Sequence, residues 1–446
     1  LKLSRGLGDV YKRQVDEIET MKIWNSKNQK INQKVDTFLS GEDIHLDNEI
    51  FIFDVDASIA HTDELLAIKL LTGNEASLLK RELKKIKKDF LSGKLTLNKK
   101  FEDCHSAIEY LLIKELGDIG KKIHTGRSRN DQVLVALRLY QQHYLKIIRD
   151  LVLRLAKELL RKSKQNENLP MPGYTHLQRA MPSTWGLWFS SYVEAFLDDV
   201  ELLDAISDWT NINPLGTAAG YGVNLPIKRE LSTKKLGFRR PQVNALYVQN
   251  SRGKMDLEIL GALKQPFLDL RKLSWDLSLF TSSEFDLIKI GKEFTTGSSI
   301  MPNKSNPDTV EIMRANYAKL AGYYAEIENL ISLPSGYHRD LQISKGAIIN
   351  AFNICESSFS LAPALIKSLK INKKRAAEMI DSDMQMTDQA NALVQQGIPF
   401  RDAYRSVKNN PNKHKSLSSK TNASSVGSAN NLKLNLLSSR LKKLAK

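Results

Sequence analysis

The chain has 446 residues, of which 41% are hydrophobic, so it is long enough for two or three domains with sizeable cores. No run of about eighteen or more apolar residues occurs, which excludes a membrane-spanning helix. The two cysteines, Cys104 and Cys355, are too few for a disulfide framework and lack the spacing of metal ligands, so we expect two buried thiols in a reducing compartment.

The formal net charge of +16 is unevenly distributed, because residues 408–446 contain nine Lys or Arg and no Asp or Glu. Residues 80–88 contain six basic residues against Glu82, a spacing typical of the solvated face of an amphipathic helix. Neither run is interleaved with the aromatic residues that stack on bases, so we expect no nucleic-acid partner. The alternative, a nucleic-acid-associated protein, would bind with steep salt dependence and lose binding on truncation at Lys408.

The N-terminal segment, residues 1–20, mixes charged residues with Gly6 and Gly8 and precedes Met21, where the letters MKIW read as a natural start. We expect this segment to be a non-native or disordered extension. It lacks the apolar core and the small-residue cleavage site of a secretory signal. We therefore expect a cytoplasmic protein with no membrane partner.

Long helices are predicted from the positions of the prolines and the spacing of apolar residues. No proline precedes Pro170, and apolar residues recur at three- and four-residue steps from Asp131 to Lys164, which predicts one helix of about 50 Å. Pro266 and Pro363 predict kinks in two later helices. Similar patterns predict helices over residues 183–211, 256–287, 308–331 and 345–369.

The predicted fold class is all-α. Alternating β patterns are short, and the best of them, Phe51–Val55 and Ala245–Val248, are equally compatible with helix. Helices of about 25 to 35 residues exceed the usual mean, which indicates an elongated bundle. Apolar residues surround almost the whole circumference of residues 185–196, so we expect other subunits to complete the bundle, unless this helix is buried inside one subunit.

The first polar segment that could carry chemistry is His124–Gln132, just before the longest predicted helix. Its two arginines, Asn130 and its hydroxyl groups could form a carboxylate cradle, since Arg donates in bidentate fashion and Asn both donates and accepts. On this interpretation Arg127, Ser128 and Asn130 bind substrate. The alternative is a helix cap made by Ser128 or Asn130, with solvated arginines.

The second segment, Pro170–Pro182, is a loop that prolines and Gly173 would make rigid, and it presents Thr175 and His176. A preorganised histidine is the usual acid–base group near neutral pH. A lone histidine is more often a structural residue with its hydrogen bonds satisfied, so this segment by itself does not establish a catalytic role.

The third segment, residues 295–308, precedes another predicted helix. Gly297 permits movement, Ser298 offers a hydroxyl group, and Lys304 and Asn306 add cationic and amide donors. A long capped turn, the structural alternative, explains the Asn-Pro-Asp ending but gives the serines and Lys304 no role.

Together these segments resemble the three signature regions of the fumarase/aspartase superfamily, whose shared reaction is the elimination of fumarate. GSSIMPNKSNPD is similar to the superfamily's signature loop. HTGRSRNDQ and PGYTHLQRAMP are similar to the forms found in the argininosuccinate lyase family and its lens-crystallin relatives. The resemblance spans about Met21 to Val407 and includes the further segments Glu102–Glu109, Asn213–Gly222, Ser251–Lys254 and Thr387–Asn391.

The resemblance implies an all-α subunit of three domains, homotetrameric around a central bundle of long helices, with each active site shared between subunits. The corresponding domains here are residues 21–125, 126–376 and 377–446, the last with the basic tail. It also implies cleavage of argininosuccinate to arginine and fumarate, as in arginine biosynthesis, with no cofactor and no metal. The alternatives are another fumarate-releasing lyase and an inactive, crystallin-like homologue.

Residue by residue, the resemblance implies that Ser298 is the base that takes the β proton and that His176 is the partner acid–base group. Lys304 and Asn306 match the family's carboxylate clamp. The serine that touches substrate in the family is not identifiable near Phe38–Asp43, and Ser58 and His61 fit a neighbouring family segment only weakly. The remaining substrate-contacting positions match Asn130, Thr175, Tyr337, Gln342 and Lys345.

Overall fold

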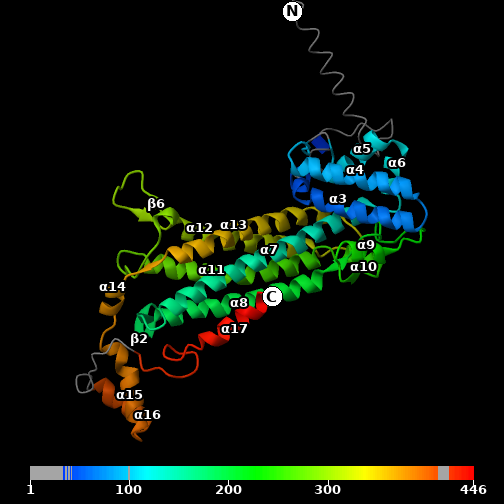
Figure 1. Ribbon diagram of the computed structural model, residues 1–446. Coiled ribbons are helices and arrows are strands. Elements are labelled where there is room, and N and C mark those ends of the chain that lie inside the picture. The colour runs from blue at the N-terminus through cyan, green and yellow to red at the C-terminus, as the bar shows by residue number, and fades with distance from the viewer. Residues whose placement is uncertain (1–33, 36–37, 39–40, 42, 99–100, 410–420) are drawn as a thin grey trace, which may run out of the picture. The chain divides into compact units, whose positions relative to one another are not determined.

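The computed structural model describes residues 34–35, 38, 41, 43–98, 101–409 and 421–446 (Figure 1). The predicted extension, residues 1–20, and part of the basic tail lie outside the described residues. The chain divides into two compact units, each assembled from three separate stretches. The domain boundaries given by the resemblance stay predictions. The first unit comprises Leu1–Leu145, Ser207–Glu258 and Tyr324–Asn350, and the second comprises Lys146–Ile206, Ile259–Tyr323 and Ala351–Lys446.

The predicted long helices are present, and the all-α class is confirmed. Four of the five begin and end within two residues of the predicted limits. The fifth was predicted to reach residue 287 but ends at Phe280, because the chain turns there and Asp286 adopts a left-handed conformation with φ of 47°. The five helices are α7 (Arg129–Gln165), α8 (Trp185–Thr210), α11 (Lys254–Phe280), α12 (Asp308–Leu330) and α13 (Ser344–Ser368).

The first unit contains a further group of helices, of which α3 to α6 lie together in Figure 1. The two candidate strand patterns are both helical, one inside α3 and the other in α10. Short parallel strands β3 and β4 pair at Ile212 and Arg240. The elements are α3 (Asp43–Ala67), α4 (Gly73–Leu91), α5 (Cys104–Leu116), α6 (Asp118–Lys121), η1 (Lys122–His124), β3 (Ile212–Asn213), α9 (Arg229–Lys235), β4 (Arg240–Pro241), α10 (Ala245–Asn250) and η3 (Arg339–Gln342).

The basic run at residues 80–88 lies on α4, as its spacing predicts. Thr72 and Glu75 form a capping box at the start of this helix. Leu79, Leu83 and Ile86 are buried on the face toward the rest of the unit. Lys80 pairs with Asp63, Lys87 with Asp56, and Lys85 with Glu82 and Glu115, so much of the positive charge is matched by neighbouring carboxylates.

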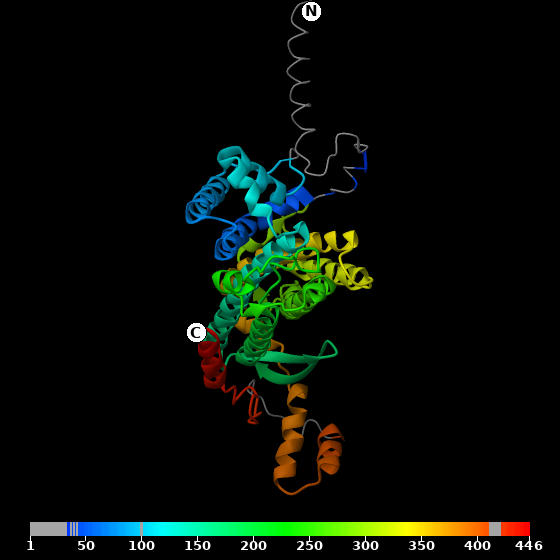
Figure 2. The ribbon, with the colours of Figure 1, turned by 90° about the vertical axis from the view of Figure 1, so that its right-hand side faces the viewer.

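The second unit contains three two-stranded antiparallel sheets and a group of shorter helices. Figure 2 shows the largest sheet, the β1–β2 hairpin, as two long arrows. The elements are β1 (Pro170–Thr175), β2 (Gln178–Thr184), β5 (Ile288–Lys289), η2 (Lys292–Phe294), β6 (Thr296–Gly297), β7 (Ser305–Asn306), β8 (Lys370–Ile371), α14 (Lys373–Glu378), η4 (Asp383–Gln385), α15 (Met386–Gln395), α16 (Phe400–Asn409) and α17 (Leu434–Leu444).

Aromatic residues of α8 form much of the core of the second unit. Trp185 packs edge-on against Phe280 of α11, with ring centroids 5.8 Å apart. The indole N–H of Trp188 and the hydroxyl of Tyr192 both donate to one carboxylate oxygen of Asp276, at 2.9 and 2.7 Å. Burial and the adjacent Asp276 raise the pKa of Tyr192, so this hydroxyl stays a donor. Completion of the bundle by other subunits stays a prediction.

Two simple expectations about the chain are confirmed. Cys104 and Cys355 are both fully buried free thiols. Of the helices that the structure describes, none combines the length and the apolar character needed to cross a bilayer.

Gly253, between α10 and α11, allows a close approach of two segments of the first unit. Its φ is +76°, and an added Cβ would lie 2.2 Å from Cγ2 of Ile331. We expect Gly253→Ala to lower the free energy of unfolding by about 2–4 kcal/mol, from left-handed strain and overpacking together. Gly93→Ala is the matched control, because Gly93 has a φ of +74° but open space around it. Thermal unfolding should show a clearly larger loss for Gly253, and equal losses would contradict the clash.

Candidate active site

The segment His124–Gln132 in the first unit begins the longest helix. The Ser128 hydroxyl accepts the Asn130 N–H at 3.2 Å, and the Ser128 N–H donates to the Asp131 carboxylate at 2.9 Å. The other Asp131 oxygen accepts two backbone N–H groups, from Gly216 and Ala218, each at 3.0 Å. Ser128 therefore caps α7, as one interpretation of the sequence proposed, and buried Asp131 fixes the capped turn against a second loop.

Arg127 is buried, so the alternative of solvated arginines is wrong for this residue. Only 8% of it is exposed, and its guanidinium donates to the Ser58 hydroxyl at 3.0 Å. Its Nε has no hydrogen-bond partner among the described residues. His61 accompanies it, with Nε2 2.9 Å from the Thr125 carbonyl oxygen. Ser58 and His61 of α3 therefore contact the segment before α7, through Arg127 and the Thr125 carbonyl oxygen. Their weak resemblance to a family segment did not predict these contacts.

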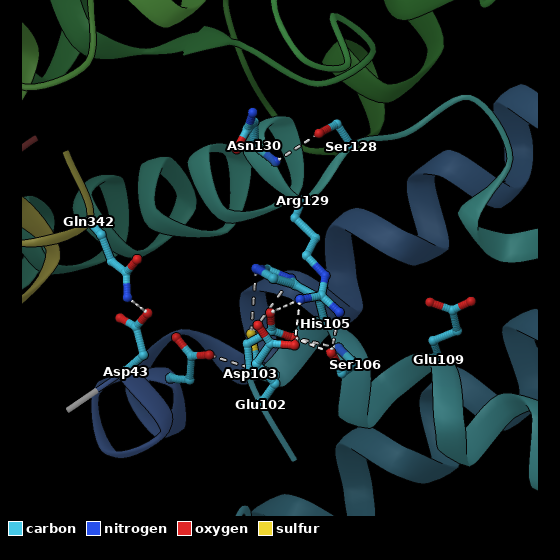
Figure 3. Close-up of polar contacts among 12 residues, drawn as sticks. Asp43, Glu102, Asp103, His105, Ser106, Glu109, Ser128, Arg129, Asn130 and Gln342 are labelled. Carbon is cyan, nitrogen blue, oxygen red and sulfur yellow. Dashed lines mark hydrogen bonds and ion pairs between the residues drawn. The ribbon is translucent and has the colours of Figure 1, made fainter. Parts of the chain in front are cut away.

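Arg129 connects the start of α7 to the segment Glu102–Glu109 (Figure 3). Its guanidinium lies 2.9 Å from the Glu102 carboxylate and 3.1 Å from that of Asp103. It also donates to the Ser106 hydroxyl at 2.8 Å. Asp103 in turn caps α5 by accepting the Ser106 N–H at 2.7 Å. Sequence reasoning named this segment only as similar to the family and assigned no residue in it.

Cys104 and His105 of this segment form a buried group with Asp54 of α3. Their ligand-type atoms lie within 4.8 Å of one another, but His105 Nδ1 and Asp54 Oδ2 are only 2.6 Å apart. Ligands on one tetrahedral Zn²⁺ would be about 3.3 Å apart, so this contact is a hydrogen-bonded ion pair. Burial alone lowers the pKa of His105, but Asp54, Asp103 and Asp47 together outweigh burial, so the net pKa is raised. Burial raises the pKa of the Cys104 thiol well above its ordinary value.

Gln342 and Lys345, two of the predicted substrate-contacting residues, come together around two aspartates of α3. Lys345 Nζ lies 2.7 Å from Asp43 and 2.6 Å from Asp47. The Gln342 amide donates to the second oxygen of Asp43 (Figure 3). The second oxygen of Asp47 accepts the Cys104 N–H at 2.8 Å. Burial alone lowers the pKa of Lys345, but Asp47 and Asp43 raise it beyond its ordinary value, which keeps the amine charged.

Tyr337, a third predicted substrate contact, lies against an arginine that sequence reasoning did not assign. The Arg252 guanidinium carbon is 4.9 Å from the centroid of the Tyr337 ring, within the range of a cation–π contact. Arg252 is only 8% exposed, and its Nη1 has no hydrogen-bond partner among the described residues. Burial lowers the pKa of Arg252, while Tyr337, Asp256 and Asp43 oppose that effect.

In the second unit, the predicted rigid loop Pro170–Pro182 is instead the β1–β2 hairpin. His176 and Leu177 form its two-residue turn, with φ values of 54° and 59°. Such turns usually contain Asn and Gly, because left-handed conformations are costly for other residues. His176 and Thr175 are both exposed at the tip. The strained turn therefore holds the histidine out from the sheet, and strain of this kind is concentrated at functional positions.

The third polar segment, residues 295–308, is also partly a hairpin, since β6 pairs with β7 through Thr296–Asn306 and Gly297–Ser305. Ser298 begins the tip. Its hydroxyl oxygen accepts the N–H groups of Ile300 and Met301, at 3.3 and 3.0 Å. Lys304 is exposed on the same tip, and Asn306 lies in β7. Two backbone N–H groups therefore donate to the Ser298 oxygen, which the family resemblance predicts to be the base.

Comparison with known proteins identifies the family to which the chain belongs. Residues 16–322 match the family described as Lyase. The chain is 47% identical over 385 residues to an argininosuccinate lyase of Stenotrophomonas maltophilia, covering 86% of this chain and 89% of the relative. It is 48% identical, with the same coverage, to that of Xanthomonas campestris.

Among solved structures, the fold is similar to EDDS lyase in complex with formate. The TM-score is 0.74 at 20% sequence identity, covering 94% of this chain and 92% of that one. A likeness at this identity supports the fold alone, whereas the curated relatives share nearly half of their residues over most of both chains. This chain is therefore a member of the argininosuccinate lyase family.

Proposed function

We propose that the chain is a carbon–nitrogen lyase that splits argininosuccinate into arginine and fumarate. The observation that carries this proposal is the identity of 47–48% to argininosuccinate lyases over 86% of the chain. The chain also contains the three motifs HTGRSRNDQ, PGYTHLQRAMP and GSSIMPNKSNPD.

The reaction requires removal of a weakly acidic C–H proton next to a carboxylate, which places a second negative charge on that carboxylate. Donors must already point at the position where this charge develops. In our proposal the Lys304 ammonium group and the Asn306 amide bind the carboxylate and stabilise the dianion. Their place on one hairpin supports this role, because both then move with Ser298.

Ser298 is proposed to take the β proton. A serine hydroxyl is a poor base unless its alkoxide form is stabilised. The N–H groups of Ile300 and Met301, which donate to this oxygen, would supply part of that stabilisation. Gly297, directly before it, would allow the tip to close and exclude water.

His176 is proposed to assist departure of the guanidinium group of arginine, directly or through a water molecule, by proton transfer. Its exposed position on the turn of β1–β2 leaves the imidazole accessible to a ligand. Thr175, the neighbouring predicted substrate contact, is exposed on the same tip.

The remaining substrate contacts are proposed in the first unit. We propose homotetrameric assembly with active sites shared between subunits, and a cytoplasmic location. The proposed contacts there are Arg127, Ser128, Asn130, Tyr337, Gln342 and Lys345.

The proposal is tested by supplying the purified chain with argininosuccinate, malate, aspartate or adenylosuccinate and following fumarate by its ultraviolet absorbance. We expect fumarate from argininosuccinate alone, without added metal or nucleotide. Fumarate from another of the four would replace the substrate assignment. No product from any of them, with a correctly assembled protein, would favour the crystallin-like alternative.

A further inference from the structure

We propose that His61 is a positioning residue for substrate binding, because it holds the Thr125 carbonyl oxygen and so fixes the segment that precedes α7. This segment carries the proposed substrate contacts Arg127, Ser128 and Asn130. The inference therefore rests on the proposed function. It adds a residue of α3 that touches no substrate but determines where three residues that do touch it are placed. His61 lies 64 positions before Thr125, and the family resemblance gave it no role.

The two ring nitrogens of His61 both face oxygen atoms. Nδ1 lies 2.9 Å from Oε2 of Glu64, and Nε2 lies 2.9 Å from the Thr125 carbonyl oxygen. Burial and the nearby Arg127 lower the pKa of His61, although Glu64 and Thr125 oppose this effect, so the neutral ring with a single N–H is favoured. A carbonyl oxygen can only accept, whereas a carboxyl group that carries a proton can donate to Nδ1. The single N–H therefore belongs on Nε2, where it donates to Thr125.

The segment is held at both ends and has a pivot between them. Downstream, the cap of α7 holds Ser128. Upstream, His61 holds Thr125. Gly126 lies between these points with a φ of +72°, a conformation that glycine adopts without strain. Loss of the upstream contact would let the chain turn about Gly126 while α7 keeps its cap, and Arg127 would move because it follows the glycine directly.

The neighbouring contact from α3 cannot replace that of His61. Ser58 lies one turn before His61 on the same face of the helix and accepts the Arg127 guanidinium at 3.0 Å. That contact holds the end of a long side chain and leaves the backbone of the segment free to rotate. His61 holds the backbone itself, so the place of the segment depends on the imidazole.

The test compares two amide replacements of the imidazole by steady-state kinetics with argininosuccinate. The amide of His61→Asn reaches the position of Nδ1 and can still donate to Glu64, but it ends short of Thr125. The amide of His61→Gln reaches the position of Nε2 and can donate to Thr125. We expect His61→Asn to raise KM about tenfold, the effect of one buried hydrogen bond, and His61→Gln to restore most of the loss. The kcat should stay within about threefold, because the contact positions substrate and transition state alike.

Hydrogen–deuterium exchange of the protein without substrate reports the position of the segment directly. The Arg127 N–H donates to the His124 carbonyl oxygen at 3.1 Å and closes the turn at Gly126. His61→Asn should speed exchange in peptides that cover residues 122–128 by about tenfold, and His61→Gln should not. Exchange in α4 and α5 should stay as in the wild-type protein. A variant that only weakens the fold would instead speed exchange throughout the unit.

Two further variants control the test. His143→Asn replaces an exposed histidine of α7 and should leave KM and exchange unchanged. The double variant His61→Leu with Glu64→Leu replaces a buried polar pair by apolar side chains, a change that is often neutral for stability, so it serves if His61→Asn does not fold. It should raise KM and exchange as asparagine does. An unchanged KM in these variants, or a glutamine variant as impaired as asparagine, would contradict the inference.

The outcome can be separated from that of the proposed function. Turnover of argininosuccinate by the wild-type protein, with the same KM in His61→Asn, would overturn the inference and leave the function intact. Absence of turnover by the wild-type protein would overturn the function. Exchange measured without substrate would then still show whether His61 fixes residues 122–128.

Discussion

Replacement of Ser298 by alanine is expected to lower kcat for argininosuccinate about 10³-fold, within the range found for removal of a general base. The reason is local. The Ser298 oxygen is the atom at which the N–H groups of Ile300 and Met301 converge, and alanine leaves those donors without the group that would take the proton. Steady-state fumarate production gives kcat, and calorimetry with arginine gives affinity, which should stay within about threefold because arginine carries no β proton to remove.

A control variant for this experiment is Ser92→Ala, at the exposed C-terminus of α4 in the other unit. It should keep normal turnover and normal assembly. If Ser298→Ala retained near-normal kcat, serine could not be the base, although the family assignment would stand.

Replacement of Lys345 by methionine is expected to lower the free energy of unfolding by about 3–5 kcal/mol, the usual cost of leaving a buried charge without its partner. Asp47 is almost fully buried, and Lys345 is the cation that both it and Asp43 contact at 2.6 and 2.7 Å. Calorimetric melting should show a loss of several degrees, and arginine binding should also fall. Lys94→Met, at an exposed lysine, is the control.

The pH dependence of this variant follows from its charges. The pKa of Lys345 is raised above 10.5, so in the wild-type protein its contribution is complete at neutral pH and is lost only at strongly alkaline pH. Burial already raises the pKa of Asp43, and without the lysine nothing from Lys345 opposes that effect, so its neutral form is favoured further. The difference in melting temperature between variant and wild type should therefore shrink as pH falls from about 7 to 5. A difference that grows on acidification would contradict the ion-pair assignment.

The long helices could be predicted because a helix with one buried face has apolar residues at three- and four-residue steps, and this spacing is visible in the local sequence. Predicted limits of 131–164 and 308–331 correspond to observed helices of 129–165 and 308–330. The hairpin at residues 170–184 cannot be predicted from the local sequence, because its prolines are typical of loops. Both strands of a two-stranded sheet are edge strands. An edge strand tolerates proline at positions where the backbone N–H does not take part in the sheet.

The sequence indicates which motif residues are candidates for the site, but it does not indicate most of the partners that the fold gives them. Nothing local to Asp43 or Asp47 indicates a lysine about 300 positions away, and only the folded chain joins them. The sequence likewise does not indicate that Arg127, predicted to donate to substrate, is buried with its guanidinium donating to the Ser58 hydroxyl. Its role toward substrate stays a prediction.

The distance along the chain between Asp47 and Lys345 has a consequence for biosynthesis. These residues are 298 positions apart, so at roughly 5–20 residues per second the ribosome needs about 15 to 60 s to deliver the lysine after the aspartate. During that interval the Asp47 carboxylate of α3 lacks the Lys345 ammonium group that neutralises it in the folded chain. The nascent N-terminal region should therefore remain incompletely folded and dependent on chaperones until the last stretch of its unit emerges.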